Sequence, residues 1–92
     1  MADDQQQSPR AQSDALTRAI DLALSGDWEG AHKIVQMHEG DATSNWIHAV
    51  LHKIEGDAAN SRYWYGRTER GYEDCADPRA ELTAIRAGLA QI

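Results

Sequence analysis

Two Gly-Asp pairs, Gly26-Asp27 and Gly56-Asp57, stand 30 residues apart, and each lies between stretches with the apolar spacing of helices. Glycine ends a helix readily because it accepts the left-handed conformation of a C-terminal cap, and aspartate caps the start of the next helix. Each pair therefore predicts a sharp corner between two helices. Together the two corners require the chain to turn back on itself twice.

Apolar residues recur every three or four positions along most of the chain, and no segment alternates with a period of two. The sequence therefore predicts an all-α fold: two antiparallel helix hairpins and a C-terminal capping helix. The helices are expected from Ser13 to Gly26, from Asp27 to Gly40, from the caps at 41–44 to Gly56, from Asp57 to a loop at 71–76, and from Asp77-Pro78 onward. Residues 1–12 are predicted to be a disordered tail, and residues 13–92 a single helical domain.

The two hairpins also align with each other at an offset of 30 residues, so that Ile20 meets Val50 and Ile34 meets Trp64. The stretch 26–31, Gly-Asp-Trp-Glu-Gly-Ala, is similar to the Gly-Asp-aromatic-Glu-x-Ala turn of tetratricopeptide (TPR) repeats. Over residues 13 to 72 the chain thus resembles the TPR superfamily, which implies a right-handed stack of hairpins. The period of 30 is shorter than the usual period of about 34, and Ala58 and Ser61 replace the usual aromatic residue and alanine.

Two repeats are fewer than a solenoid usually needs, because each unit buries its apolar face only against its neighbours. The fifth helix is therefore expected to close the stack; alternatively, a second chain completes it. The stretch 48–57, with Asn60 and Tyr63-Trp64-Tyr65 after it, also resembles a small family of helical bacterial and fungal proteins. That resemblance implies no activity.

Charge and composition exclude several classes of function. The chain has 9 Lys+Arg against 15 Asp+Glu, a formal net charge of −6, which argues against non-specific binding to nucleic acid. No apolar run is long enough for a transmembrane helix, so no membrane partner is expected. The single cysteine, Cys75, cannot form an internal disulfide, and a cytoplasmic location is expected. Phosphate-loop, dinucleotide-binding and nucleophile-elbow motifs are absent from the sequence.

One polar stripe stands out on the third predicted helix: His48, His52 and Glu55 follow each other at i, i+4 and i+7. Two histidines one turn apart can share a divalent transition metal, and the carboxylate could be a third ligand. Two other interpretations stay open, namely a solvated or half-buried polar face and a pocket without metal. His32 is expected to be a packed residue with one hydrogen bond.

Across the second corner, the fourth predicted helix carries Asn60, Tyr63 and Arg67. If these side chains border the histidine stripe, the whole set could form a small-molecule acid–base or anion site. Alternatively, Arg67 and Arg70 pair with acidic residues at the surface. Tyr63, Trp64 and Tyr65 are consecutive on a helix and cannot all enter one core, so Tyr63 is expected in a second layer, a pocket or an interface.

Two functions follow from this pattern. The first is a protein or peptide interaction module without a cofactor, which self-associates as a homo-oligomer. The second is a small-molecule or metal-binding protein, or an enzyme, that uses the six residues His48, His52, Glu55, Asn60, Tyr63 and Arg67. The lack of catalytic motifs favours the first function, and the ligand or partner is not identified by the sequence.

Overall fold

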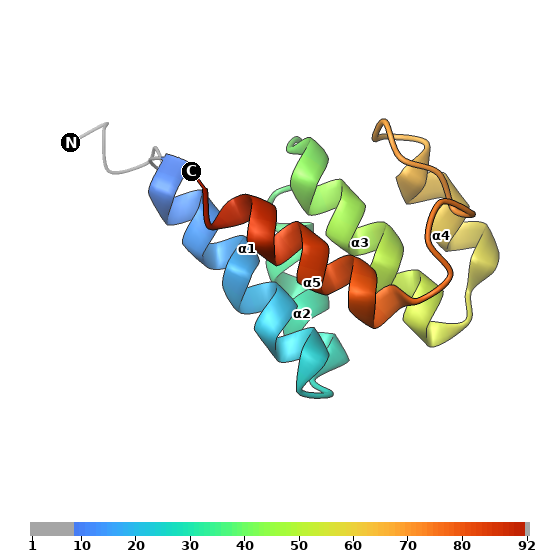
Figure 1. Cartoon of the computed structure of the whole chain (residues 1–92), viewed down its shortest axis with the longest axis horizontal. Helices are drawn as coiled ribbons and strands as arrows, with labels where there is room; N and C mark the ends of the chain where they lie inside the picture. Colours follow the sequence, from blue (N-terminus) through green and yellow to red (C-terminus); the bar gives the residue numbers. More distant parts are fainter. Residues whose placement is uncertain (1–8, 92) are drawn as a thin grey trace.

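The computed structural model describes residues 9–91 of the chain. Within these residues the secondary structure consists of helices joined by turns and loops, and no strand occurs (Figure 1). The all-α prediction is thereby confirmed. The helices are α1 (Pro9–Leu24), α2 (Trp28–Gln36), α3 (Ala42–Glu55), α4 (Ala58–Tyr65) and α5 (Pro78–Leu89).

The two predicted corners are present. Gly26 and Gly56 have φ angles of 98° and 88°, in the left-handed region that glycine accepts at low cost. The carboxylates of Asp27 and Asp57 then accept backbone N–H groups in the first turns of α2 and α4. Helices α1 and α2 pack against each other, as do α3 and α4, while the arrangement of these pairs as hairpins in the right-handed stack that the TPR resemblance implies remains a prediction.

The start of α1 differs from the prediction. The helix begins at Pro9, because proline suits the first helical position, so residues 9–12 are helical and not part of a tail. Ser13, where the helix was expected to begin, lies inside it. Its buried Oγ donates to the carbonyl oxygen of Leu89 at the end of α5 (3.2 Å). The rest of the predicted tail, residues 1–8, lies outside the described residues, as does Ile92.

The fourth helix is shorter than predicted and ends at Tyr65. The Oγ1 of Thr68 donates to the Tyr65 carbonyl oxygen and accepts the backbone N–H of Arg70 (2.8 and 3.0 Å). Such local bonds compete with helical ones, and Gly66 weakens the helix at the same place. Arg67 and Arg70 therefore lie on a loop rather than on successive helical turns. The second helix likewise ends at Gln36, before the predicted Gly40.

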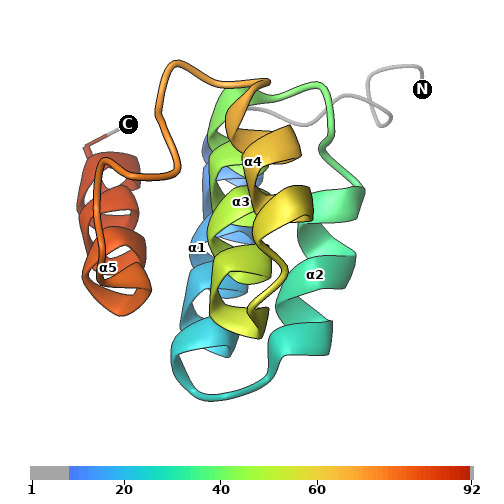
Figure 2. The same cartoon turned by 90° about the vertical axis from the view of Figure 1, so that its right-hand side faces the viewer.

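The helices form three layers (Figure 2). Helices α1 and α3 lie in the middle, α2 and α4 cover one side, and α5 lies across the other side in contact with both α1 and α3. Ser61 on α4 is fully buried and donates its hydroxyl to the Ala49 carbonyl oxygen on α3 (2.7 Å), which allows close approach of these two helices.

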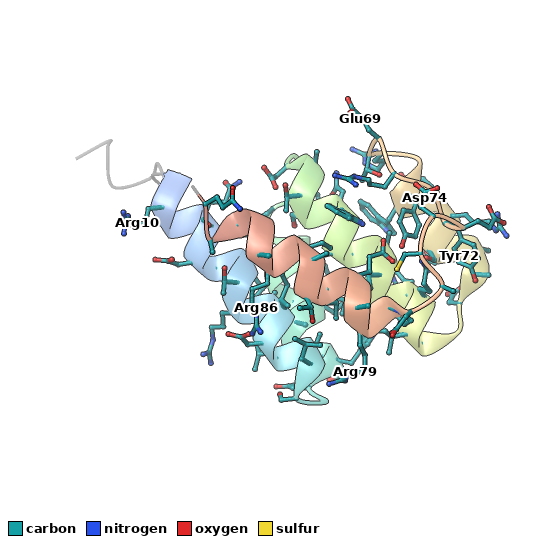
Figure 3. All side chains as sticks on the ribbon, viewed as in Figure 1. Arg10, Glu69, Tyr72, Asp74, Arg79 and Arg86 are labelled. Carbon is teal, nitrogen blue, oxygen red and sulfur yellow. The ribbon has the colours of Figure 1, made fainter. Side chains whose placement is uncertain are left out.

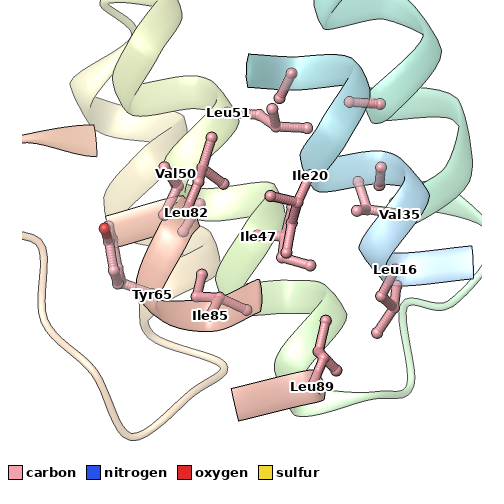
Figure 4. Packing of buried hydrophobic residues seen from close by; sticks show 14 residues of the cluster. Leu16, Ile20, Val35, Ile47, Val50, Leu51, Tyr65, Leu82, Ile85 and Leu89 are labelled. Atoms are coloured by element: carbon pink, nitrogen blue, oxygen red, sulfur yellow. The ribbon is translucent and has the colours of Figure 1, made fainter. Parts of the chain in front are cut away.

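The apolar core fills the space between the middle layer, α2 and α5 (Figure 4). Seven of its large aliphatic side chains have no more than about 1% of their surface exposed, and they come from four helices. They are Leu16, Ile20, Val35, Ile47, Val50, Leu51 and Leu82. Within the described residues, no helix combines the length and apolar character needed to cross a membrane.

A buried polar contact attaches α5 to the rest of the molecule. The Glu81 carboxylate on α5 accepts the Trp46 indole N–H and the Tyr65 hydroxyl, each at 2.7 Å, and pairs with Lys53 Nζ at 3.0 Å. Glu81 is 4% exposed, and its three partners satisfy a charge that would otherwise be costly to bury. Burial and this carboxylate together raise the pKa of Tyr65, which stays protonated and donates.

Candidate metal centre

Three histidines from two helices meet on the side of α3 that faces away from α5. His32 lies on α2, and His48 and His52 lie one turn apart on α3. One ring nitrogen of each lies within 4.8 Å of the others, and the Nε2 atoms of His32 and His48 are 3.0 Å apart. We call these three residues the histidine cluster. The structure therefore makes a site from residues 16 and 20 positions apart in the sequence.

Two tryptophans enclose the cluster. The Trp28 ring stacks on His32 (centroids 4.6 Å apart), and the Trp64 ring stacks on His48 (4.0 Å). The Trp28 indole N–H donates to the Leu51 carbonyl oxygen of α3 at 2.7 Å, which fixes its orientation. The imidazoles of His32 and His48 are thus held in defined planes with their Nε2 atoms facing each other.

Glu55 determines which nitrogen of His52 is available to a ligand. Its Oε1 lies 2.7 Å from His52 Nδ1, so Nδ1 carries the proton and donates it to the carboxylate. Nε2 of His52 is then the unprotonated nitrogen. A carboxylate behind a histidine in this way orients the ring and increases its basicity as a metal ligand.

Burial favours the neutral form of two histidines of the cluster, His48 and His32. Only 2% of His48 and 7% of His52 is exposed, so the two histidines of the polar stripe are buried, whereas the Glu55 side chain is 43% exposed. Loss of hydration, with smaller contributions from His32 and His52, lowers the pKa of His48 to about 3. Burial and the neighbouring His52 also lower the pKa of His32. Neutral imidazoles at neutral pH have the lone pairs that a metal ion requires.

The Nε2 atoms of His32 and His48 lie close to the spacing of two nitrogens bound to one metal ion. Two imidazole nitrogens bound to one tetrahedral zinc ion lie about 3.3 Å apart, given Zn–N distances of about 2.0–2.1 Å. The observed Nε2–Nε2 distance of 3.0 Å is a few tenths of an ångström shorter. Without a metal, one of these two nitrogens must carry a proton and donate it to the other.

A second group of possible ligands lies beside the cluster and consists of His52, Glu55 and Asp57. Its acceptors are engaged elsewhere: Glu55 accepts from His52, and both oxygens of Asp57 accept from Asn60 at the start of α4. These hydrogen bonds lower the pKa of Asp57, which is the carboxylate of a helix cap. The histidine cluster is the better candidate for a metal.

The structure brings only part of the predicted site together. His48 and His52 lie in the cluster, whereas Glu55 contacts His52 alone, so the predicted trio of ligands is divided between the two groups. Tyr63 is 56% exposed and meets Trp64 edge-on, and the Arg67 guanidinium lies 5.6 Å from the centre of the same indole ring. These two residues flank the wall of the site but do not enter it.

Asn60 takes no part in the site. Its side chain is exposed and donates to the Asp57 carboxylate at the start of α4. Tyr63 is exposed and thus lies off the core, whereas Tyr65 from the same run is buried in it; a place for Tyr63 in a second layer, a pocket or an interface remains a prediction. The predicted surface pairing of Arg67 and Arg70 with acidic residues is not found within residues 9–91.

His32 is the member of the histidine cluster that the sequence interpretation missed. It was expected to be packed with one hydrogen bond, and it does contact His48 through Nε2. A useful signal was present, because Trp28 and His32 lie at i, i+4 on the side of α2 that includes the buried Ala31 and Val35. What the sequence lacked was the pairing of this side with the histidine side of α3.

Comparison with known proteins identifies no relative of this chain. No family model matches the chain, and neither the curated proteins nor the solved structures contain a significant match. The site therefore has to be interpreted from its own geometry.

Proposed function

We propose that this protein binds a divalent transition-metal ion through Nε2 of His32, His48 and His52. The observation that carries the proposal is the convergence of three imidazoles, with one ring nitrogen of each within 4.8 Å of the others, enclosed by two indole rings. Three histidines that leave one coordination position open form a common type of zinc or copper site. The ligand atoms are nitrogens only, which suits Zn²⁺, Cu²⁺ and Ni²⁺ better than Mg²⁺ or Ca²⁺.

The Glu55–His52 contact gives the proposal independent support. A simple packing role for His52 does not require a carboxylate at 2.7 Å from Nδ1, since this carboxylate is 43% exposed and could be solvated. A carboxylate–histidine pair behind a metal is a recurrent arrangement that fixes the ring and the tautomer. Glu55, predicted as a direct ligand, is on this proposal a residue that positions one.

The test is a calorimetric titration of metal-free protein with Zn²⁺ and, separately, with Mg²⁺. Wild-type protein is expected to bind one Zn²⁺ and no Mg²⁺. His32→Gln removes a proposed ligand at a half-buried position. It is expected to lower the affinity for Zn²⁺ at least about 100-fold, since loss of a residue that only supports a ligand lowers metal affinity about 10–100-fold. Glu55→Gln is expected to fall in that smaller range.

The matched control is His38→Gln, because His38 is the fourth histidine of the chain and does not belong to the cluster. This variant is expected to bind Zn²⁺ like the wild type. Helical circular dichroism of each variant shows that the fold is retained. Equal Zn²⁺ affinities of the His32 and His38 variants, or no saturable Zn²⁺ binding by the wild type, would contradict the proposal.

A further inference from the structure

A second site is formed by the loop that follows α4. A cleft of about 440 Å³ lies between this loop and the first turn of α3, and its lining includes Thr43, Trp46, Arg67 and Arg70. This volume falls within the range of small-molecule sites. The histidine cluster is not part of the lining of the cleft, although Arg67 contacts Trp64, one of the two tryptophans that enclose the cluster.

The two guanidinium groups of the cleft are held in place by tryptophan rings. Arg70 lies 4.1 Å from the centre of the Trp46 ring, and Arg67 lies 5.6 Å from that of Trp64. The Trp46 ring is itself fixed, because its N–H donates to the buried Glu81 carboxylate. A cation on an aromatic face is stabilised without losing its hydrogen-bond donors, so both guanidinium groups stay available for an anion.

Within the described residues, no acidic side chain forms an ion pair with the two arginines of the cleft. Arg62 pairs with Glu73, and Arg86 pairs with Asp21, whereas Arg67 and Arg70 make no ion pair within the described part of the chain. Both residues line the same cleft, which thus has two positive charges on a chain whose net charge is −6. Their joint position in one cleft is best explained by an anionic ligand.

We propose that this cleft binds a small organic phosphate, with Arg67 and Arg70 on the phosphate group and Thr43 as a further hydrogen-bond donor. Guanidinium groups bind phosphate oxygens in pairs. Two of them balance the charge of a phosphate monoester dianion, whereas a carboxylate would leave one unbalanced. The cleft is also larger than a free phosphate ion requires, which leaves room for an organic part.

Glu69 lies on the rim and is the one acidic residue in the lining. Its side chain points outward from the tip of the loop (Figure 3) and is exposed. The Glu69 carboxylate repels an anion bound in the cleft, but it does not block the cleft. Removal of this charge is therefore expected to strengthen binding, which gives a variant that changes affinity in the opposite direction.

The test is isothermal titration of metal-free protein with glycerol 3-phosphate at low ionic strength, with glycerol and inorganic phosphate in parallel. We expect one saturable site for glycerol 3-phosphate, weaker binding of inorganic phosphate and none of glycerol. Arg67→Gln and Arg70→Gln are each expected to weaken binding about tenfold or more, the usual contribution of a charged hydrogen bond. Glu69→Gln is expected to bind more tightly than the wild type.

Arg18→Gln is the matched control. Arg18 is exposed on α1, and its substitution changes the net charge by the same amount as Arg67→Gln or Arg70→Gln, but outside the cleft. It is expected to bind like the wild type. The proposal is overturned if glycerol 3-phosphate gives no saturable heat, if Arg18→Gln weakens binding as much as Arg70→Gln, or if inorganic phosphate binds as tightly as the ester. None of these outcomes depends on the metal site.

Discussion

The most unusual residue of the molecule is His48, a buried imidazole between an indole and a second imidazole. Its Nδ1 is buried and has no hydrogen-bond partner within residues 9–91, so the side chain is only partly satisfied. A buried polar atom of this kind costs free energy. The proposed metal on Nε2 would account for the close contact between His48 and His32, but it would not provide a partner for Nδ1.

The lowered pKa of His48 makes the stability of the metal-free protein depend on pH. Its pKa is about 3 in the folded chain and about 6.5 in the unfolded chain, so below pH 6.5 the unfolded state binds the additional proton. The free energy of unfolding is therefore expected to fall as pH falls from about 6.5, by up to about 1.4 kcal/mol per pH unit. His32 acts in the same direction, because its pKa is also lowered.

Urea unfolding at several pH values between about 7.5 and about 5 measures this dependence. The lowered pKa of Asp57 acts only below its unfolded value near 3.8, so it does not contribute in this window. His48→Phe keeps an aromatic ring against Trp64 and is expected to reduce the slope, while His38→Gln retains it. A free energy of unfolding that stays constant over this range in the wild type would show that His48 is not held neutral.

At the scale of single elements, α5 depends on one buried carboxylate. Loss of Glu81 leaves the Lys53 ammonium, the Tyr65 hydroxyl and the Trp46 indole N–H without their partner. Glu81→Ala is therefore expected to lower the free energy of unfolding by about 3–5 kcal/mol, as for other broken buried ion pairs. Glu73→Ala, at an exposed pair with Arg62, is expected to cost less than about 1 kcal/mol. Equal costs in denaturant unfolding would contradict this assignment.

The corners between helices depend on the backbone of glycine. Gly56 has a φ of 88°, where an alanine is strained even though no heavy atom would lie within 4 Å of its Cβ. Gly56→Ala is expected to destabilise the fold by about 1–2 kcal/mol. Gly88 has equally free surroundings but lies inside α5, so Gly88→Ala is expected to stabilise by about 0.5–1 kcal/mol.

Thermal unfolding of the two variants measures this difference directly. The expected result is a decrease in Tm for Gly56→Ala and an increase for Gly88→Ala. A decrease of the same size in both variants would show that side-chain space, and not backbone conformation, limits these positions.

For the molecule as a whole, the pattern of the sequence predicted the element order well because the corners are local. A left-handed glycine followed by a capping aspartate is specified by neighbouring residues alone. The end of α4 was predicted several residues beyond Tyr65, where the helix ends. The hydrogen bonds of Thr68 to the backbone of Tyr65 and Arg70 compete with those of the helix, and the spacing of apolar residues does not reveal them. The same error placed Arg67 and Arg70 on a helix.

The site was harder to predict than the fold, because it depends on how two helices face each other. His48 and His52 share a helix, so their proximity follows from spacing alone. His32 reaches them only through the packing of α2 on α3, which no local pattern specifies. The proposed interaction module remains a prediction, and α5 already covers the face that α1 and α3 would offer to a peptide.

The most direct test of the proposed metal centre is a crystal structure of the zinc-loaded protein with anomalous data at the zinc edge. The account predicts one strong anomalous peak between α2 and α3, about 2.0–2.1 Å from Nε2 of His32, His48 and His52. Glu55 should remain on His52 Nδ1, outside the coordination shell. A peak on His38 or on surface carboxylates, with the three histidines still in contact and no metal between them, would contradict it.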